Sequence, residues 1–270
     1  IAASGTVANA RGMAPRALIH SYEWNNDMAE MAARAASAPG QGSKLYLSNH
    51  SYGHDVGWYN DGGWRWRYAL ATMQDPSFGR YNADAHNLDA VAYNAPYYLP
   101  MFCGMNSRND GPASGATCYY WNGSSWSSFT YNPAVHPPGD GVHKGGYDTL
   151  ATYAVAKNCL TVGAVNDAVL NFMGLLLRWP PSASMSVFSN WGPADDGRIK
   201  PDVVGNGVDV YSSHNSGNAA YSTASGTSMA TPNVCGTAAQ LLQYFRRFGN
   251  EPRASTMKAL LIHTADDLGT

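Results

Sequence analysis

Charged residues are scarce in this sequence, and no stretch of it is strongly basic. Asp, Glu, Lys and Arg make up 13% of the 270 residues, and the formal net charge is −2. A globular domain usually has about a quarter of charged residues. Without a basic run there is nothing to neutralise a row of phosphates, so the sequence excludes nucleic acid as a partner.

Long hydrophobic runs are also missing. The longest, at residues 172–177, is far too short to cross a bilayer, which excludes a membrane span. The opening residues IAASG lack the basic start of a secretion signal and indicate the interior of a longer chain. No repeat or linker divides the sequence, so we expect a single domain over residues 1–270, cut at both ends.

Cysteine is rare, with four residues at Cys103, Cys118, Cys159 and Cys235. Their spacing fits no zinc-binding pattern. Two interpretations stay open. One or two disulfides would suit an exported protein, with Cys103 and Cys118 as the simplest pair because they flank one loop. Otherwise the four residues are buried free thiols.

What the sequence does contain is an alternation of strand and helix patterns. Strands are expected at residues 17–22, 44–49, 97–103 and 159–165, with short strands at 203–210 and 211–213. Helices are expected from residue 27 until the glycines at 40 and 42, and at 83–95, 229–248 and 252–265. This alternation predicts an α/β fold with a mostly parallel central sheet flanked by helices.

Two long insertions interrupt that pattern, at about residues 54–82 and 107–158. Both are rich in Trp and Tyr. Loops of this length are usually functional or are packed by their own side chains. We expect the aromatic residues to bury one another beneath the loops, with direct contact to a substrate as the alternative.

Ser228 is the first candidate for chemistry. It follows Gly226 and Thr227 at the predicted start of a long helix. A serine there lies near unpaired backbone N–H groups, which stabilise an oxyanion that develops on a substrate carbonyl. The alternative is that Ser228 only caps the helix.

Asn106 is the second candidate. It ends the segment Cys103-Gly104-Met105-Asn106 at the carboxyl end of a predicted central strand, where ligands bind in open parallel sheets. Its amide can donate to a developing negative charge, although it can equally satisfy a turn. Residues 51–53 end another predicted strand and are expected to border the same crevice.

The segment GTSMATP at residues 226–232 resembles the nucleophile motif of the subtilisin-like serine peptidases. Further segments resemble the same family: GMAP at 12–15, SNHSYG at 48–53, FSNWGP at 188–193 and RIKPD at 198–202. The resemblance covers most of the chain apart from the two insertions. It implies a three-layer fold and a secreted, monomeric serine endopeptidase that acts on proteins or peptides.

The resemblance also implies roles for individual residues. Ser228 would be the acylated nucleophile, and Asn106 and the backbone N–H of Ser228 would form the oxyanion hole. Substrate would pair with Ser51, Tyr52 and Gly53 as an added strand. The substrate-binding residues would also include Cys103, Gly104 and Thr227. The chemistry would need no cofactor. Calcium commonly stabilises the family, and the candidate ligands are Asp110, Asp140, Asp195 and Asp196, which otherwise are solvated loop charges.

Three departures from the family pattern stand out. Met105 replaces a glycine beside Asn106, and Asn233 replaces a common histidine. More seriously, the family's triad runs Asp, His, Ser, and its histidine motif HGTHVAGT is missing here. We therefore expect the catalytic Asp and His upstream of Ile1 and little activity in the isolated chain. His50 and His54 are the nearest substitutes within the chain, and satisfied groove histidines are the better interpretation of both.

Other function classes compete with a peptidase. A non-catalytic protein that binds peptides in the same groove is the main alternative. An esterase or lipase is disfavoured because Ala230 stands where the Gly-X-Ser-X-Gly elbow has its final glycine. Sugar binding by the Trp-rich insertions also stays open.

Overall fold

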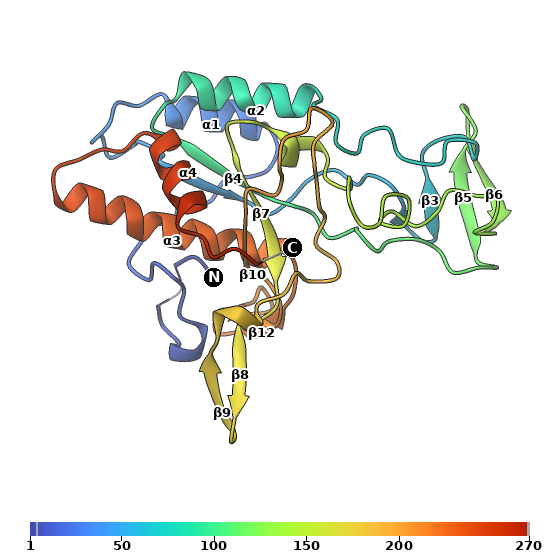
Figure 1. Ribbon diagram of the computed structural model, residues 1–270. Helices are drawn as coiled ribbons and strands as arrows, with labels where there is room; N and C mark the ends of the chain where they lie inside the picture. The colour runs from blue at the N-terminus through green and yellow to red at the C-terminus, as the bar shows by residue number, and fades with distance from the viewer. Residues whose placement is uncertain (4, 269–270) are drawn as a thin grey trace.

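The computed structural model describes residues 1–3 and 5–268, and its centre is a four-stranded parallel sheet (Figure 1). The strand order is β1-β4-β7-β10. The strands are β1 (Leu47–His50), β4 (Leu99–Cys103), β7 (Leu160–Val165) and β10 (Val203–Asn206). Every residue of β4 and β7 is buried, as expected for central strands covered on both faces.

Helices cover the two faces of this sheet (Figure 1). One face carries α1 (Asp27–Ala35) and α2 (Ala83–Asn94), and the other carries α3 (Thr227–Arg247) and α4 (Ala254–His263). Successive side chains of a strand point to opposite faces. In β4, Leu99 and Met101 accordingly pack with α3 and α4, whereas Phe102 packs with α1 and α2. The expected α/β fold is therefore confirmed.

A second sheet gathers residues from both expected insertions. Its order is β2-β3-β5-β6, with β2 (Tyr59–Asn60), β3 (Trp64–Trp66), β5 (Thr117–Trp121) and β6 (Trp126–Thr130). It lies to one side of the central sheet (Figure 1). Trp58 and Trp66 are buried with Cys118 and Tyr131, so the expected mutual burial of aromatic residues is confirmed for these two tryptophans. Trp121 and Trp126 are partly exposed.

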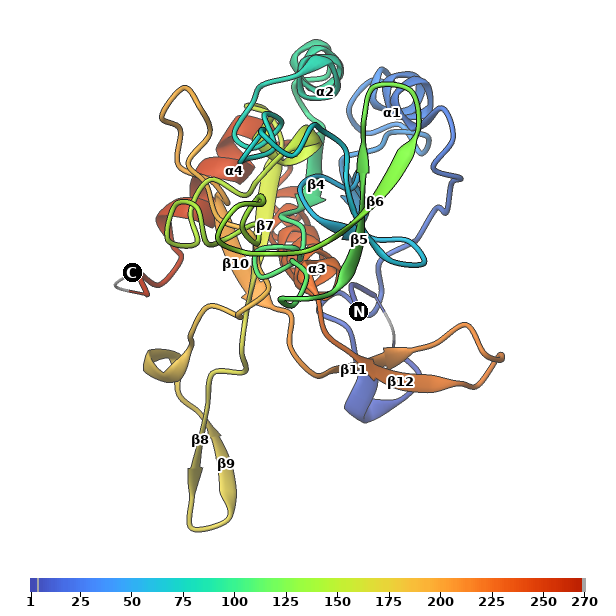
Figure 2. The same cartoon turned by 90° about the vertical axis from the view of Figure 1, so that its right-hand side faces the viewer.

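Two β-hairpins extend away from the body of the protein (Figure 2). One joins β8 (Val169–Phe172) to β9 (Leu175–Arg178), and the other joins β11 (Val210–Ser213) to β12 (Tyr221–Ala224). Three short 3-10 helices complete the described elements: η1 (Ala8–Ala10), η2 (Thr152–Val155) and η3 (Pro180–Ser182). None of the described helices is long and apolar enough to cross a bilayer.

The expected strand at residues 17–22 is wrong. This segment has no regular structure, and Leu18 and Ile19 are 91% and 71% exposed. A strand is stable only beside a partner, and no described residue pairs with this segment. The cysteines are free thiols, and Cys103, Cys118 and Cys159 are buried, so the second of the two interpretations applies.

Candidate active site

Ser228 lies in the first turn of α3, which begins two residues earlier than expected. Gly226 precedes the helix at φ 156°, a conformation that side chains other than glycine rarely adopt. The Ser228 hydroxyl donates to the carbonyl oxygen of Ser51 at 3.3 Å, and Ser51 Oγ donates to the carbonyl oxygen of Ser228 at 2.9 Å. Ser228 is therefore not the capping residue, and it faces the carboxyl end of β1.

Asn106 is held against the start of the same helix. Its Oδ1 accepts hydrogen bonds from the backbone N–H of Thr227 at 2.8 Å and from Thr227 Oγ1 at 2.9 Å. Both partners are donors to this oxygen, so the assignment of oxygen and nitrogen in the amide follows from the network. The amide nitrogen Nδ2 is therefore not engaged by Thr227.

Two unpaired donors converge beside Ser228. A Cβ placed on Gly226 would lie 3.4 Å from Asn106 Nδ2 and 3.6 Å from the backbone N of Ser228. In the part of the chain that the structure describes, neither group donates a hydrogen bond. Met229 Sδ lies 3.6 Å from the same point, which is one bond length from Gly226 Cα. The two donors therefore lie close together on this side of Gly226, where they can donate to a substrate oxygen placed beyond it.

The segment Ser51-Tyr52-Gly53 follows β1 directly and is anchored by a buried hydrogen-bond chain. Tyr52 OH donates to Asp27 Oδ2 at 2.7 Å, and His50 Nδ1 lies 2.6 Å from Tyr52 OH. Since the Tyr52 proton goes to the carboxylate, Tyr52 accepts from His50 Nδ1–H. His50 Nε2 then accepts from Ser48 Oγ, 2.6 Å away. The chain ties this segment to α1.

Burial lowers the pKa of His50 to about 4, although the nearby Asp27 carboxylate opposes the shift. The ring is therefore neutral at pH 7, and it stacks on Phe102 with 4.3 Å between ring centroids. His54 is exposed and lies 3.9 Å from Asp84. Neither histidine is hydrogen-bonded to Ser228. Each interacts with other side chains, as expected for histidines that border the groove and have no catalytic role.

Cys103 and Gly104 lie at the end of β4, where all of the expected site residues meet. Cys103 Sγ lies 3.7 Å from the carbonyl oxygen of Tyr52. Burial raises the pKa of the Cys103 thiol, and hydrogen bonding with Thr227 and Ser228 opposes that shift. The thiol is therefore an uncharged neighbour of Ser228. Gly104 N–H donates to Val162 O at 2.8 Å and continues the pairing with β7.

Met105 takes the backbone conformation of the glycine that it replaces. Its φ is 71°, in the left-handed region, which costs a non-glycine residue about 1 kcal/mol or more. The turn survives because Asn190, which is fully buried, holds it on both sides. Asn190 N–H donates to Met105 O at 3.2 Å, and Asn190 Oδ1 accepts from Ser107 N–H at 2.8 Å. Asn190 thus fixes the backbone on both sides of Asn106.

Two supports of the site were not found from the sequence. Asn190 lies in the FSNWGP segment that carries the family resemblance, so its position in the motif was visible but its contacts were not. Asp27 lies at the start of α1, and nothing in the sequence connects it to Tyr52. Both act on the site through hydrogen bonds between residues distant in the sequence.

The candidate calcium ligands Asp140 and Asp196 have other partners in the structure. Burial raises the pKa of Asp140 to about 9, with further contributions from Asp110 and Asp75, and both Asp140 oxygens accept the N–H of Trp58. Asp196 is paired with Arg198 at 2.9 Å. Among the described residues, no group of three or more His, Cys, Asp or Glu side chains could hold a metal ion.

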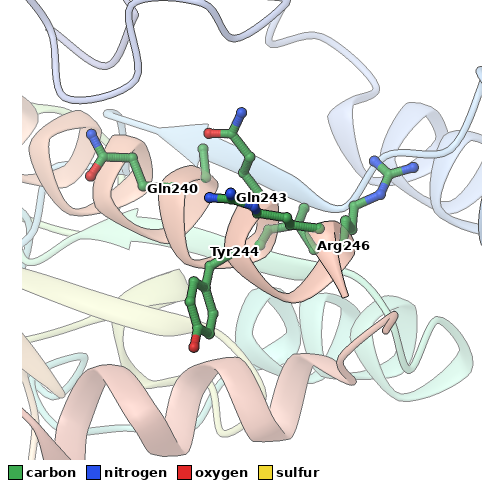
Figure 3. Close-up of a pocket in the computed structure, with 7 residues that line it drawn as sticks. Gln240, Gln243, Tyr244 and Arg246 are labelled. Carbon is green, nitrogen blue, oxygen red and sulfur yellow. The ribbon is translucent and has the colours of Figure 1, made fainter. Parts of the chain in front are cut away.

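A surface hollow lies elsewhere, along the second half of α3. Gln240, Gln243, Tyr244 and Arg246 project from the helix around it (Figure 3). At about 1.5 Å per residue, its nearest lining residue, Ala239, lies about 16 Å along the helix from Ser228. This hollow is therefore separate from the site at the helix start.

Known proteins resemble parts of this chain. Pyrolysin from Pyrococcus furiosus is 34% identical over 112 residues, which are 36% of this chain and 8% of pyrolysin. C5a peptidase from Streptococcus pyogenes is 48% identical over 59 residues, which are 21% of this chain and 5% of that protein. The chain thus matches only a small part of the length of either relative.

One solved structure and one family model match most or all of the chain. The self-cleaved protease domain of PatA has a TM-score of 0.51 at 19% identity, over 90% of this chain and 60% of that chain. A likeness at this identity supports the fold alone. The subtilase family, in contrast, matches residues 1–270. The chain therefore belongs to the subtilase family of serine peptidases.

Proposed function

We propose that this chain is the nucleophile-bearing part of a serine endopeptidase and that Ser228 is acylated by the substrate. The observation that carries the proposal is that Asn106 Nδ2 and the backbone N of Ser228 lie close together, on the side of Gly226 that lacks a side chain and next to Ser228 itself. Two donors placed this way stabilise the oxyanion of a tetrahedral intermediate. Membership of the subtilase family supports the same chemistry.

The reaction uses only protein groups and water. Ser228 Oγ bonds to the carbonyl carbon of the scissile peptide and loses its proton to a general base. The C–N bond then breaks as the base returns that proton to the leaving amine. Water hydrolyses the resulting ester and restores the serine. The substrate backbone is held along Ser51, Tyr52 and Gly53, and Cys103, Gly104 and Thr227 surround the reacting group.

The general base lies outside the given sequence in this proposal. No described histidine is hydrogen-bonded to Ser228, whose hydroxyl donates to Ser51 O instead. The order of family motifs assigns the histidine and its aspartate to residues upstream of Ile1. A serine without a base is a weak nucleophile, so the isolated 270-residue chain is expected to show little or no peptidase activity.

The test is to treat the protein from its natural source with a small fluorophosphonate and to map the adduct by mass spectrometry. We expect one adduct on Ser228, in a species heavier than 28.9 kDa. The Ser228→Ala variant should not react. Secretion is part of the proposal and is tested by recovering the labelled species from the culture medium.

The competing function is a peptide-binding protein that does not cut. It predicts no adduct on Ser228 under conditions that label a control serine peptidase, together with retained binding of peptides. That result would overturn the proposed reaction and leave the groove as a binding site.

A further inference from the structure

The side chain of Met105 lies across the gap between the two strand ends that form the site. Gly53 belongs to the segment after β1, and Met105 belongs to the segment after β4. A Cβ placed on Gly53 would lie 2.6 Å from Met105 Sδ and 3.2 Å from Met105 Cε. The thioether therefore rests on the Gly53 backbone and takes the volume that a side chain would need there.

The other walls of this gap are small. Gly53 has no side chain, and the same point beside it lies 3.7 Å from Thr152 Oγ1. Thr152 is buried at the start of η2. The backbone of Met105 is fixed by Asn190, which donates to its carbonyl oxygen. Of Gly53, Thr152 and Met105, only Met105 carries a long side chain, and its thioether occupies the space beside Gly53.

A substrate held for acyl transfer must place a side chain at this gap. Its reacting carbonyl lies between Ser228 Oγ and the Asn106 amide, and its backbone pairs with residues 51–53. The residue that supplies the carbonyl is therefore enclosed by the two strand-end segments, and its side chain leaves the backbone between them. A side chain longer than one or two carbons meets the Met105 thioether.

We propose that Met105 is a specificity-determining residue that restricts cleavage to peptide bonds after small residues such as Gly, Ala or Ser. This inference rests on the proposed function, since it assumes that Ser228 attacks the carbonyl. The preference is a difference in transition-state free energy: the transition state with a small side chain fits the gap, and the one with a larger side chain does not. Methionine is flexible, so a longer substrate side chain enters the gap only by displacing the thioether from Gly53.

The test compares the complete natural protein with its Met105→Gly variant. Glycine suits the left-handed backbone at this position, so the variant is expected to fold. Second-order rates of Ser228 modification are measured with two peptidyl phosphonates that carry either an Ala-like or a Phe-like side chain. We expect the wild type to prefer the Ala-like probe, and the variant to shift the Phe-to-Ala ratio by about tenfold or more towards Phe.

Met173→Gly is the matched control. Met173 is also a methionine at positive φ, 51°, but it is 88% exposed at the tip of the β8–β9 hairpin. Its replacement should leave the ratio at the wild-type value. An unchanged ratio in Met105→Gly, or a wild type that reacts equally well with both probes, would overturn the inference.

A small ethyl fluorophosphonate separates this inference from the proposed function. It needs no room in the gap and should label Ser228 in all three proteins. If it labels Ser228 while the peptidyl probes show no effect of Met105, only the specificity inference fails. If it labels none of them, the proposed reaction is wrong, and the specificity inference that rests on it is wrong as well.

Discussion

At the scale of single residues, Thr227 has a clear role, because it orients the amide of Asn106. Its hydroxyl and its backbone N–H both donate to Asn106 Oδ1. In Thr227→Val the backbone bond remains and the hydroxyl bond is lost. Loss of a whole oxyanion donor costs about 100- to 1000-fold in kcat, so partial loss of its orientation should cost about tenfold. KM should change little, because the donor acts on the transition state.

Thr237→Val is the control for this prediction. Thr237 lies on the same helix, and its hydroxyl bonds to Asn233 O at 3.1 Å, away from the site. Steady-state kinetics of the complete protein should show a fall in kcat for Thr227→Val alone. Equal kinetics for both variants would mean that the backbone bond suffices to orient Asn106.

His50 predicts a pH dependence of stability. Its pKa is about 4 in the folded protein, below the ordinary 6.5, because of burial. Between pH 6.5 and 4 the unfolded chain binds a proton that the native state does not, so stability falls as the pH falls. The loss approaches roughly 3 kcal/mol near pH 4, at about 1.4 kcal/mol per pKa unit. Urea unfolding at pH 7, 5.5 and 4.5 measures it.

The variant His50→Gln should lose this part of the pH dependence, since glutamine does not titrate. The same substitution at the exposed His143 should keep the wild-type dependence. If the two variants behave alike, the acid sensitivity comes from other groups.

The residues of the site were predictable only as far as short motifs extend. Ser228 and Asn106 were predicted as site residues because each sits at one end of an element with a distinctive local sequence, and their catalytic roles stay part of the proposal. The hydrogen bonds that make them a site join Thr227 to Asn106 and Ser51 to Ser228, over more than a hundred residues. Side-chain contacts of that range depend on the packed fold, which local patterns do not describe.

At the scale of elements, long periodic patterns were predictable and short ones were not. The helices α2 and α3 and the strands β4 and β7 agree with the expected ranges to within two residues. The β2-β3-β5-β6 sheet was missed because its strands lie in the two insertions, whose length and composition indicate loops, and because β2 and β3 have only two and three residues. Its central contact pairs Trp64 with Cys118, which lie in different insertions.

The β8–β9 hairpin was missed for a different reason. Its two-residue turn, Met173-Gly174, has both residues at positive φ, 51° and 82°. Such turns usually have the sequence Asn-Gly or Asp-Gly, and a methionine at the first position does not indicate a turn. The apolar stretch at 172–177 therefore contained no turn signal, and Met173 at the tip of the hairpin is 88% exposed.

A buried network of charged residues links α4 to the end of the central sheet next to β10. Asp202, beside β10, lies 2.6 Å from Lys200 Nζ and 3.0 Å from Lys258 Nζ of α4. Lys200 is almost fully buried. Asp202→Ala leaves that ammonium without its carboxylate, which should lower the free energy of unfolding by about 3–5 kcal/mol.

The comparison is Asp61→Ala, which breaks the pair between Asp61 and Arg65 at 3.6 Å. The Asp61 side chain is 78% exposed, so the loss should stay below about 1 kcal/mol. Both values come from urea unfolding at pH 7. Similar losses for the two variants would mean that solvent reaches Lys200 in the native state.

At the scale of the whole molecule, the buried residues fall into separate clusters. The central sheet supports one cluster on each face, around Phe102 with α1 and α2 and around Met101 with α3 and α4. The second sheet has its own cluster, built from Trp58, Trp66 and the residues around them. The site lies on the central sheet, where segments after β1 and β4 meet the start of α3.

Because its core is separate, we expect the second sheet to open locally while the central sheet stays folded. Trp58 is fully buried, and its Nε1 donates to Pro138 O at 2.9 Å. Trp58→Ala removes a large side chain from a small cluster, at a cost of about 3–5 kcal/mol. Native-state hydrogen exchange should show faster exchange in β3 and β5 while β4 and β7 keep their protection.

The partly exposed Trp121 of β5 provides the control, since Trp121→Ala removes the same side chain from the surface of the same sheet. It should leave exchange in both sheets nearly unchanged. Uniform loss of protection in Trp58→Ala, with β4 and β7 exchanging as fast as β5, would show that the clusters unfold together. The second sheet would then be a cooperative part of the scaffold that holds Ser228, and its aromatic core would matter to the site as much as the central sheet does.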